Sequence, residues 1–204
     1  MEIETIGVIG ASRLGCEIAY AAAKSGYRTV LEDVSLHRLE DGTSWIRETL
    51  DKGVGNGSVT QNQRAAVLEK LVTARSVEEV CRLADLLITA ASEELETQLE
   101  LFTWFDKFAK PGAILASAAE GVSIGDLAAM TMSAENCVGL RFAPPVAAAG
   151  RLEIVQGPET SKATIQHCMA FGRRLGKEAV VLDDSSARRQ KRRRGCCDER
   201  RRAN

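Results

Sequence analysis

The chain has 204 residues, of which 45% are hydrophobic and 27% charged, a composition that excludes a disordered or collagen-like protein and favours one globular domain. No apolar run reaches the roughly 18 residues of a membrane helix and no basic leader follows Met1, so we expect a soluble cytoplasmic protein without a membrane partner. Six cysteines lack paired Cys-x-x-Cys spacing, which favours buried free thiols and no metal site.

The net charge of −1 conceals two unlike regions. Residues 185–204 carry eight arginines and one lysine against two acids, a net charge of +7, whereas residues 1–184 carry −8. We therefore predict a folded domain over residues 1–184 and a basic, disordered tail over residues 185–204.

Strand-like and helix-like segments alternate along the domain. In chain order we predict a strand at 3–9, helix 14–26, strand 27–31, helix 35–52, helix 61–71, strand 71–74, strand 83–91, helix 94–109, strand 113–116, helix 124–130, strand 137–142, strand 152–155, helix 161–175 and strand 179–182. The helices at 35–52 and 61–71 are expected to project as a hairpin. This alternation predicts an α/β fold, a doubly wound and mostly parallel sheet with helices on both faces.

The turn between the first strand and the first helix fits the dinucleotide pattern G-x-G-x-x-G, with a serine at the middle glycine. It reads Gly10-Ala11-Ser12-Arg13-Leu14-Gly15. A strand before the turn and a helix after it would direct backbone N–H groups and the positive helix end at a pyrophosphate. The alternative is a glycine turn that only permits close helix-strand packing, and the Cβ atom of Ser12 is the element that could crowd a phosphate.

An acid at the end of the second strand completes this pattern. Asp33 follows Gly15 by 18 residues, at a position where a carboxylate accepts both ribose hydroxyls and repels a 2′-phosphate. We therefore predict NAD as the cofactor rather than NADP, although Arg38, five residues further on, would argue the reverse. The predicted cofactor-binding residues of these two segments are Gly10, Ser12, Arg13, Leu14, Gly15 and Asp33.

Four stretches of the chain resemble the NAD-binding domain of the 3-hydroxyacyl-CoA dehydrogenase family. They are residues 8–19, 30–39, 110–117 and 152–161, and the resemblance extends over residues 3–184. It implies a Rossmann-type domain whose family takes part in fatty acid metabolism, with NAD accepting a hydride from the 3-hydroxyl group of an acyl-CoA. It also implies that Ala90 and Glu93 lie at the cofactor, and that the family's C-terminal helical domain is absent from this chain.

The catalytic positions depart from that resemblance. Where the family has a substrate-binding serine, this chain has Glu120 or Gly121, and where the family has a histidine base, it has Arg141. Glu153 matches the glutamate that orients the histidine. An arginine keeps its proton above about pH 12 and cannot act as a base, so we expect Glu120 either to pair with Arg141, with Glu153 as the competing partner, or to serve as the base itself.

Two functions follow from these residues. The first is an oxidoreductase domain that transfers a hydride between NAD and a 3-hydroxyacyl-CoA; the second is an NAD-binding pseudoenzyme or a truncated remnant.

Three explanations fit the basic tail: an arm that binds nucleic acid, a plain solvated tail, and a shifted reading frame, which we favour because it explains the abrupt end of the family pattern. The uncovered surface of the last strands and of the helix at 161–175 further predicts self-association.

Overall fold

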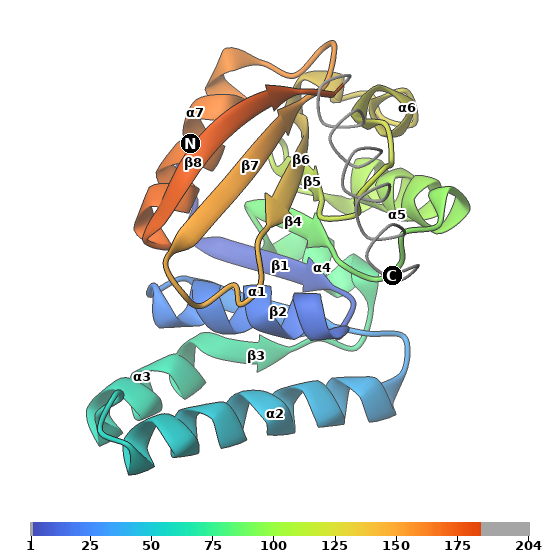
Figure 1. The fold of residues 1–204 in the computed structure, drawn as a ribbon. Helices are drawn as coiled ribbons and strands as arrows, with labels where there is room; N and C mark the ends of the chain where they lie inside the picture. The colour runs from blue at the N-terminus through green and yellow to red at the C-terminus, as the bar shows by residue number, and fades with distance from the viewer. Residues whose placement is uncertain (1, 185–204) are drawn as a thin grey trace, which may run out of the picture.

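A computed structural model describes residues 2–184 of the chain (Figure 1). The basic tail predicted for residues 185–204 lies outside the described residues, as do the two cysteines within it. Within the described part, no helix combines the length and the apolar character needed to cross a membrane.

The strands of the described residues form one sheet in the order β3-β2-β1-β4-β5-β6-β7-β8. Neighbouring strands are parallel, except that β7 runs antiparallel to β6. The first six positions have the order of a Rossmann-type sheet, which confirms the predicted fold class. The strands are β1 (Thr5–Ile9), β2 (Arg28–Glu32), β3 (Leu71–Thr73), β4 (Leu86–Thr89), β5 (Ile114–Ser117), β6 (Cys137–Phe142), β7 (Gly150–Gln156) and β8 (Lys177–Asp183).

Helices cover both faces of this sheet, as the buried central strands require. One apolar core is built from side chains of α1, α2, α3 and α7, and a second from side chains of α4, α5 and α6. Figure 1 accordingly places α7 on the opposite side of the sheet from α5 and α6. The helices are α1 (Arg13–Lys24), α2 (Leu36–Gly55), α3 (Gln61–Lys70), α4 (Val77–Leu83), α5 (Leu95–Phe108), α6 (Ile124–Ala128) and α7 (Lys162–Arg174).

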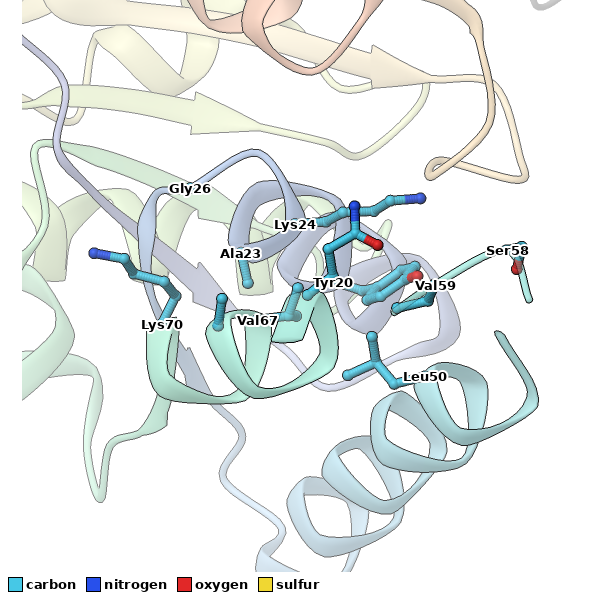
Figure 2. Close-up of a pocket in the computed structure, with 11 residues that line it drawn as sticks. Tyr20, Ala23, Lys24, Gly26, Leu50, Ser58, Val59, Val67 and Lys70 are labelled. Atoms are coloured by element: carbon cyan, nitrogen blue, oxygen red, sulfur yellow. The ribbon is translucent and has the colours of Figure 1, made fainter. Parts of the chain in front are cut away.

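The predicted helical hairpin is formed by α2 and α3, but it does not project freely. Its inner face packs against α1, with the buried side chains of Leu50, Val59 and Val67 gathered near Tyr20 of α1 (Figure 2). Between the three helices remains a cavity of about 230 Å³ whose rim includes Lys24 and Lys70. The hairpin is therefore part of the core on that face of the sheet.

One segment differs from the predicted elements. The strand expected at 83–91 is shorter, β4, and the short helix α4 lies before it. The first turn of α4 is capped by the hydroxyl of Ser76, which accepts a hydrogen bond from the backbone N–H of Glu79. The sheet is mostly parallel, as predicted, and β7 is the strand that runs antiparallel to its neighbour β6. The remaining elements agree with prediction to within a few residues at their ends.

The parallel register brings four strand ends to one level. Ile9 of β1 lies beside Glu32 of β2 on one side and Thr89 of β4 on the other, and Thr89 lies beside Ser117 of β5. The loops that follow these strands therefore meet at the carboxyl edge of the sheet. In open α/β sheets this edge, next to the point where the strand order reverses, is where ligands bind.

The opposite edge is held by a half-buried acid. Asp85, just before β4, accepts hydrogen bonds from the backbone N–H groups of Glu4 and Thr5 and pairs with Lys110 at 2.6 Å. Burial raises the pKa of this carboxyl, but the bonds from Lys110 and from the two N–H groups outweigh burial, so the pKa lies below its ordinary value. Asp85 thus joins β1 to the segment that precedes β5.

Replacing Asp85 with asparagine should lower the free energy of unfolding by about 1–3 kcal/mol at pH 7, because the charge-assisted bonds are lost. Since the folded-state pKa is depressed, the contribution of Asp85 is present above the unfolded-state value and is lost as the pH falls through the folded-state value. Urea unfolding of the wild type and the variant at pH 7 measures the loss of stability, and the same comparison below pH 4 measures whether the difference disappears. Asp41→Asn, at an exposed position of α2, is the control and should change stability by less than about 0.5 kcal/mol.

Candidate functional site

The turn after β1 is shaped by two glycines that admit no side chain. Gly10 has a φ of +103°, and a Cβ atom there would lie 2.5 Å from the Cα atom of Ala91. At Gly15, in the first turn of α1, a Cβ atom would overlap the carbonyl oxygen of Gly10. The helix can therefore start directly over the strand end only because both positions are glycine, as the sequence pattern predicts.

Ser12, the serine that replaces the middle glycine, caps α1. Its hydroxyl accepts a hydrogen bond from the backbone N–H of Gly15 at 3.2 Å and donates one to the carbonyl oxygen of Ala90 at 2.7 Å. Its backbone is extended, with a φ of −62°, so no glycine is required there. The N–H groups of Arg13 and Leu14 have no acceptor within the helix, which leaves them at the positive helix end for an anionic ligand.

Asp33, at the end of β2, is held in place on both sides of its carboxylate. One oxygen accepts a hydrogen bond from the backbone N–H of Ala11, and the other accepts bonds from the N–H of Ser35 and from the guanidinium of Arg38 at 3.0 Å. The carboxylate is buried and the arginine is largely exposed. Asp33 therefore joins the glycine turn to the start of α2, and Arg38, set aside in the sequence argument, contacts it directly.

A cavity of about 780 Å³ opens beside Asp33 at the carboxyl edge. It lies between the end of β2, the start of α4 and the side of α5. Most of its walls are apolar, with Leu36, Val77, Leu101 and Trp104 among the lining side chains. A large apolar slot with a few convergent polar groups is the usual form of a site for a nucleotide base and its ribose.

Glu32 is a residue of this cavity that the sequence argument did not select. Its side chain lines the cavity next to Asp33 and is only 4% exposed. Burial raises the pKa of Glu32 to about 7, and the charge of Asp33 adds to the rise. The sequence feature that could have identified Glu32 is an acid directly after the buried strand residues Thr29-Val30-Leu31.

Two further cavities continue along the same edge. One of about 220 Å³ is lined by Ser12 and Leu14 of the glycine turn together with Ala90 and Glu93, which the resemblance assigns to the cofactor. The next, of about 400 Å³, is lined by the carboxylates of Glu93 and Glu120 together with Asp126. Glu93 lines both of these cavities, so the two cavities adjoin each other. The predicted cofactor residues Ser12, Leu14, Ala90 and Glu93 therefore lie next to Glu120 along the carboxyl edge.

Arg141 lies on β6 opposite Glu153 of β7 in the antiparallel register. Glu120 lies on the loop after β5 and lines the acidic cavity. The expected pairing of Arg141 with Glu120, with Glu153 as the competing partner, stays a prediction.

Gln98 of α5 supports the loops beneath these cavities. Gln98 is fully buried, and its amide donates to the carbonyl oxygen of Ser92 and to the hydroxyl of Thr89 and accepts from the hydroxyl of Ser117. An amide can make all of these bonds because it carries both donors and an acceptor. Gln98 thereby joins the ends of β4 and β5.

We expect Gly15→Ala to weaken NADH binding at least tenfold and to lower the free energy of unfolding by about 2 kcal/mol or more, because its new methyl group displaces α1 from Gly10. Titration followed by nicotinamide fluorescence, with urea unfolding, measures both. Gly55→Ala is the matched control: a Cβ atom there meets no heavy atom within 4 Å, so affinity and stability should be unchanged or slightly improved. Equal affinities for the two variants would contradict the role of Gly15.

The raised pKa of Glu32 predicts how its removal changes stability. The folded state retains this proton from the ordinary value of 4.5 up to about 7, so its contribution is fully present below pH 4.5 and is lost as the pH rises to 7. Glu32→Gln should therefore be more stable than the wild type by about 2 kcal/mol at pH 8, with little advantage at pH 5. Urea unfolding at both pH values tests this against Glu40→Gln, an exposed control on α2; a pH-independent difference would refute it.

The chain is similar in sequence to known dehydrogenases. Residues 5–185 match the family described as 3-hydroxyacyl-CoA dehydrogenase, NAD binding domain. A 3-hydroxybutyryl-CoA dehydrogenase of Bradyrhizobium diazoefficiens is 35% identical over 88% of this chain and 61% of its own length. The human mitochondrial hydroxyacyl-coenzyme A dehydrogenase is 30% identical over 87% of this chain and 58% of its own length.

Solved structures give the same result. The (S)-3-hydroxybutyryl-CoA dehydrogenase PaaH1 from Ralstonia eutropha superposes with a TM-score of 0.85 at 27% identity, covering 89% of this chain and 64% of that one. The chain thus spans about three fifths of the length of the relatives named above. The chain belongs to the 3-hydroxyacyl-CoA dehydrogenase family of NAD-dependent oxidoreductases, and the part it matches is their NAD-binding domain.

Proposed function

We propose that this chain binds NAD along the carboxyl edge of its sheet and does not by itself oxidise a 3-hydroxyacyl-CoA. The adenosine would occupy the cavity at Asp33, the pyrophosphate the start of α1, and the nicotinamide the cavity lined by Ala90 and Glu93. The observation that carries the proposal is the contiguity of these three features, which together match the parts of a dinucleotide in order.

The residues of the turn fit a pyrophosphate. Gly10 and Gly15 leave the space that side chains would fill, and the N–H groups of Arg13 and Leu14 supply donors at the positive end of a helix of 12 residues. Ser12 does not close the turn, because its hydroxyl faces Gly15 and Ala90. Bound NAD would supply the hydride acceptor, and the chain would hold and orient it.

The histidine that the resemblance implies for proton transfer is replaced in this chain. Arg141 stands at the position that the resemblance gives to a histidine base, and a guanidinium does not accept a proton near neutral pH. The two histidines of the chain lie elsewhere: His37 is exposed beside Asp41 on α2, and His167 is on α7. Glu120 is the remaining candidate base, in the acidic cavity next to the nicotinamide end.

Titration of the full chain with NADH, followed by nicotinamide fluorescence, tests binding; the same sample is then assayed with acetoacetyl-CoA by NADH absorbance. Saturable binding without NADH consumption is expected. Consumption of NADH would overturn the absence of turnover, and its loss in Glu120→Gln but not in Glu135→Gln, on a distant turn, would identify Glu120 as the proton-transfer group. Absence of NADH binding would refute the whole proposal.

A further inference from the structure

The adenosine cavity contains an acid, Glu32, whose carboxyl faces the cavity and not another protein group. The residue is only 4% exposed and lines the cavity, and across residues 2–184 its side chain makes neither a hydrogen bond nor an ion pair, although its backbone carbonyl accepts a bond from the N–H of Gly10. Both carboxylate oxygens of the adjacent Asp33, by contrast, accept hydrogen bonds from the protein. Neither carboxyl oxygen of Glu32 is sealed from solvent without a partner, so the water of the cavity solvates this carboxyl, and a ligand with matching polar groups can replace that water.

The place of Glu32 in the cavity determines what it can meet. Asp33 marks the ribose, and beyond it the apolar side chains of Val77, Leu101 and Trp104 line a slot that suits a flat aromatic ring. Glu32 lies on the wall of that same cavity. On an adenine ring the exocyclic amino donor lies between two ring-nitrogen acceptors, so a carboxyl that reaches this amino group also faces an acceptor next to it.

We propose that Glu32 recognises the adenine ring of the dinucleotide, and that it does so in its protonated form. The protonated carboxyl accepts a hydrogen bond from the exocyclic amino group through its carbonyl oxygen and donates one to the neighbouring ring nitrogen through its hydroxyl. This is the donor and acceptor pattern that a glutamine amide presents to adenine. The inference rests on the proposed NAD binding and adds to it a residue that selects the base.

The proposal makes NAD affinity depend on pH. Burial and the charge of Asp33 raise the pKa of Glu32 to about 7 in the free protein, and a ligand that binds the protonated form raises it further. Affinity should therefore be greatest below pH 7 and fall as the pH rises above it. Among the other charged or titratable groups near Glu32, Asp33, Arg38, Arg75 and Glu100 line the same cavity, and α4 carries Cys81, Glu78, Glu79 and Arg82.

The variant Glu32→Gln distinguishes the effect of Glu32 on the pH dependence of affinity from the effects of these other groups. It keeps all of them unchanged, and its amide presents the hydrogen-bonding pattern of a protonated carboxyl at every pH. Calorimetric titration with NADH should show a fall in affinity of about tenfold between pH 6.5 and 8.5 for the wild type and less than about twofold for Glu32→Gln. A wild-type affinity that is flat over this range, or a variant that retains the fall, would overturn the proposal. The wild-type profile decides this even if the variant is unstable.

A second measurement asks whether the base is what Glu32 contacts. In etheno-NAD a two-carbon bridge blocks both the amino group and one ring nitrogen of adenine. At pH 6.5 the wild type and Glu32→Gln should prefer NAD over etheno-NAD by about tenfold, and Glu32→Leu, which has neither donor nor acceptor, by less than about threefold. Any steric effect of the bridge is common to the three proteins and leaves the difference between them intact.

The outcomes separate this inference from the proposed function. If the wild type binds neither NAD nor NADH, both are wrong. If it binds them but the preference over etheno-NAD is the same in the wild type and in Glu32→Leu, Glu32 does not read the base and only this inference fails. Circular dichroism of each variant at pH 6.5 confirms that the folded proteins are being compared.

Discussion

The close approach of α1 to the end of β1 is the constraint on which the rest of the site depends. The helix starts so near the strand that its first turn lies against the carbonyl oxygen of Gly10, with no room for a side chain at Gly15. The approach fixes where the positive end of the helix points and brings Ala11 within reach of the Asp33 carboxylate. The position of the second strand end, and of the cavity beside it, follows from that bond.

Binding and catalysis depend on different parts of this molecule. The features that suit a dinucleotide are mostly backbone features: two glycines, a helix start and the level ends of parallel strands. Proton transfer depends instead on the identity of single side chains, and β6 is formed with Arg141 at the position where the resemblance implies a histidine base. A family domain can therefore retain its cofactor geometry after its chemistry has been lost.

The sequence predicted the architecture well because both of its signals are local. Buried parallel strands read as continuous apolar runs, and the glycine turn with Asp33 has a defined spacing. The helix α4 escaped prediction because its seven residues are too few for a clear period, although Ser76 and Glu79 carry a capping signal. Glu32 could be ranked only once the cavity was known, since nothing in the sequence shows which distant segments enclose it.

The surroundings of Arg141 depend on strand pairing, which strand propensity does not encode. The antiparallel pairing of β6 with β7 sets Arg141 in register with Glu153, and Glu120 lies on the loop after β5, in the acidic cavity. Which of the two acids pairs with Arg141 stays a prediction.

The hydroxyl of Ser12 has a mechanical consequence. Because it is bonded at once to the N–H of Gly15 and to the carbonyl oxygen of Ala90, it ties the helix start to the loop after β4. Those two segments belong to opposite halves of the doubly wound sheet, and their gap is the one that a dinucleotide must span. Holding the gap at a set width before any ligand arrives means that less conformational entropy is lost when one binds.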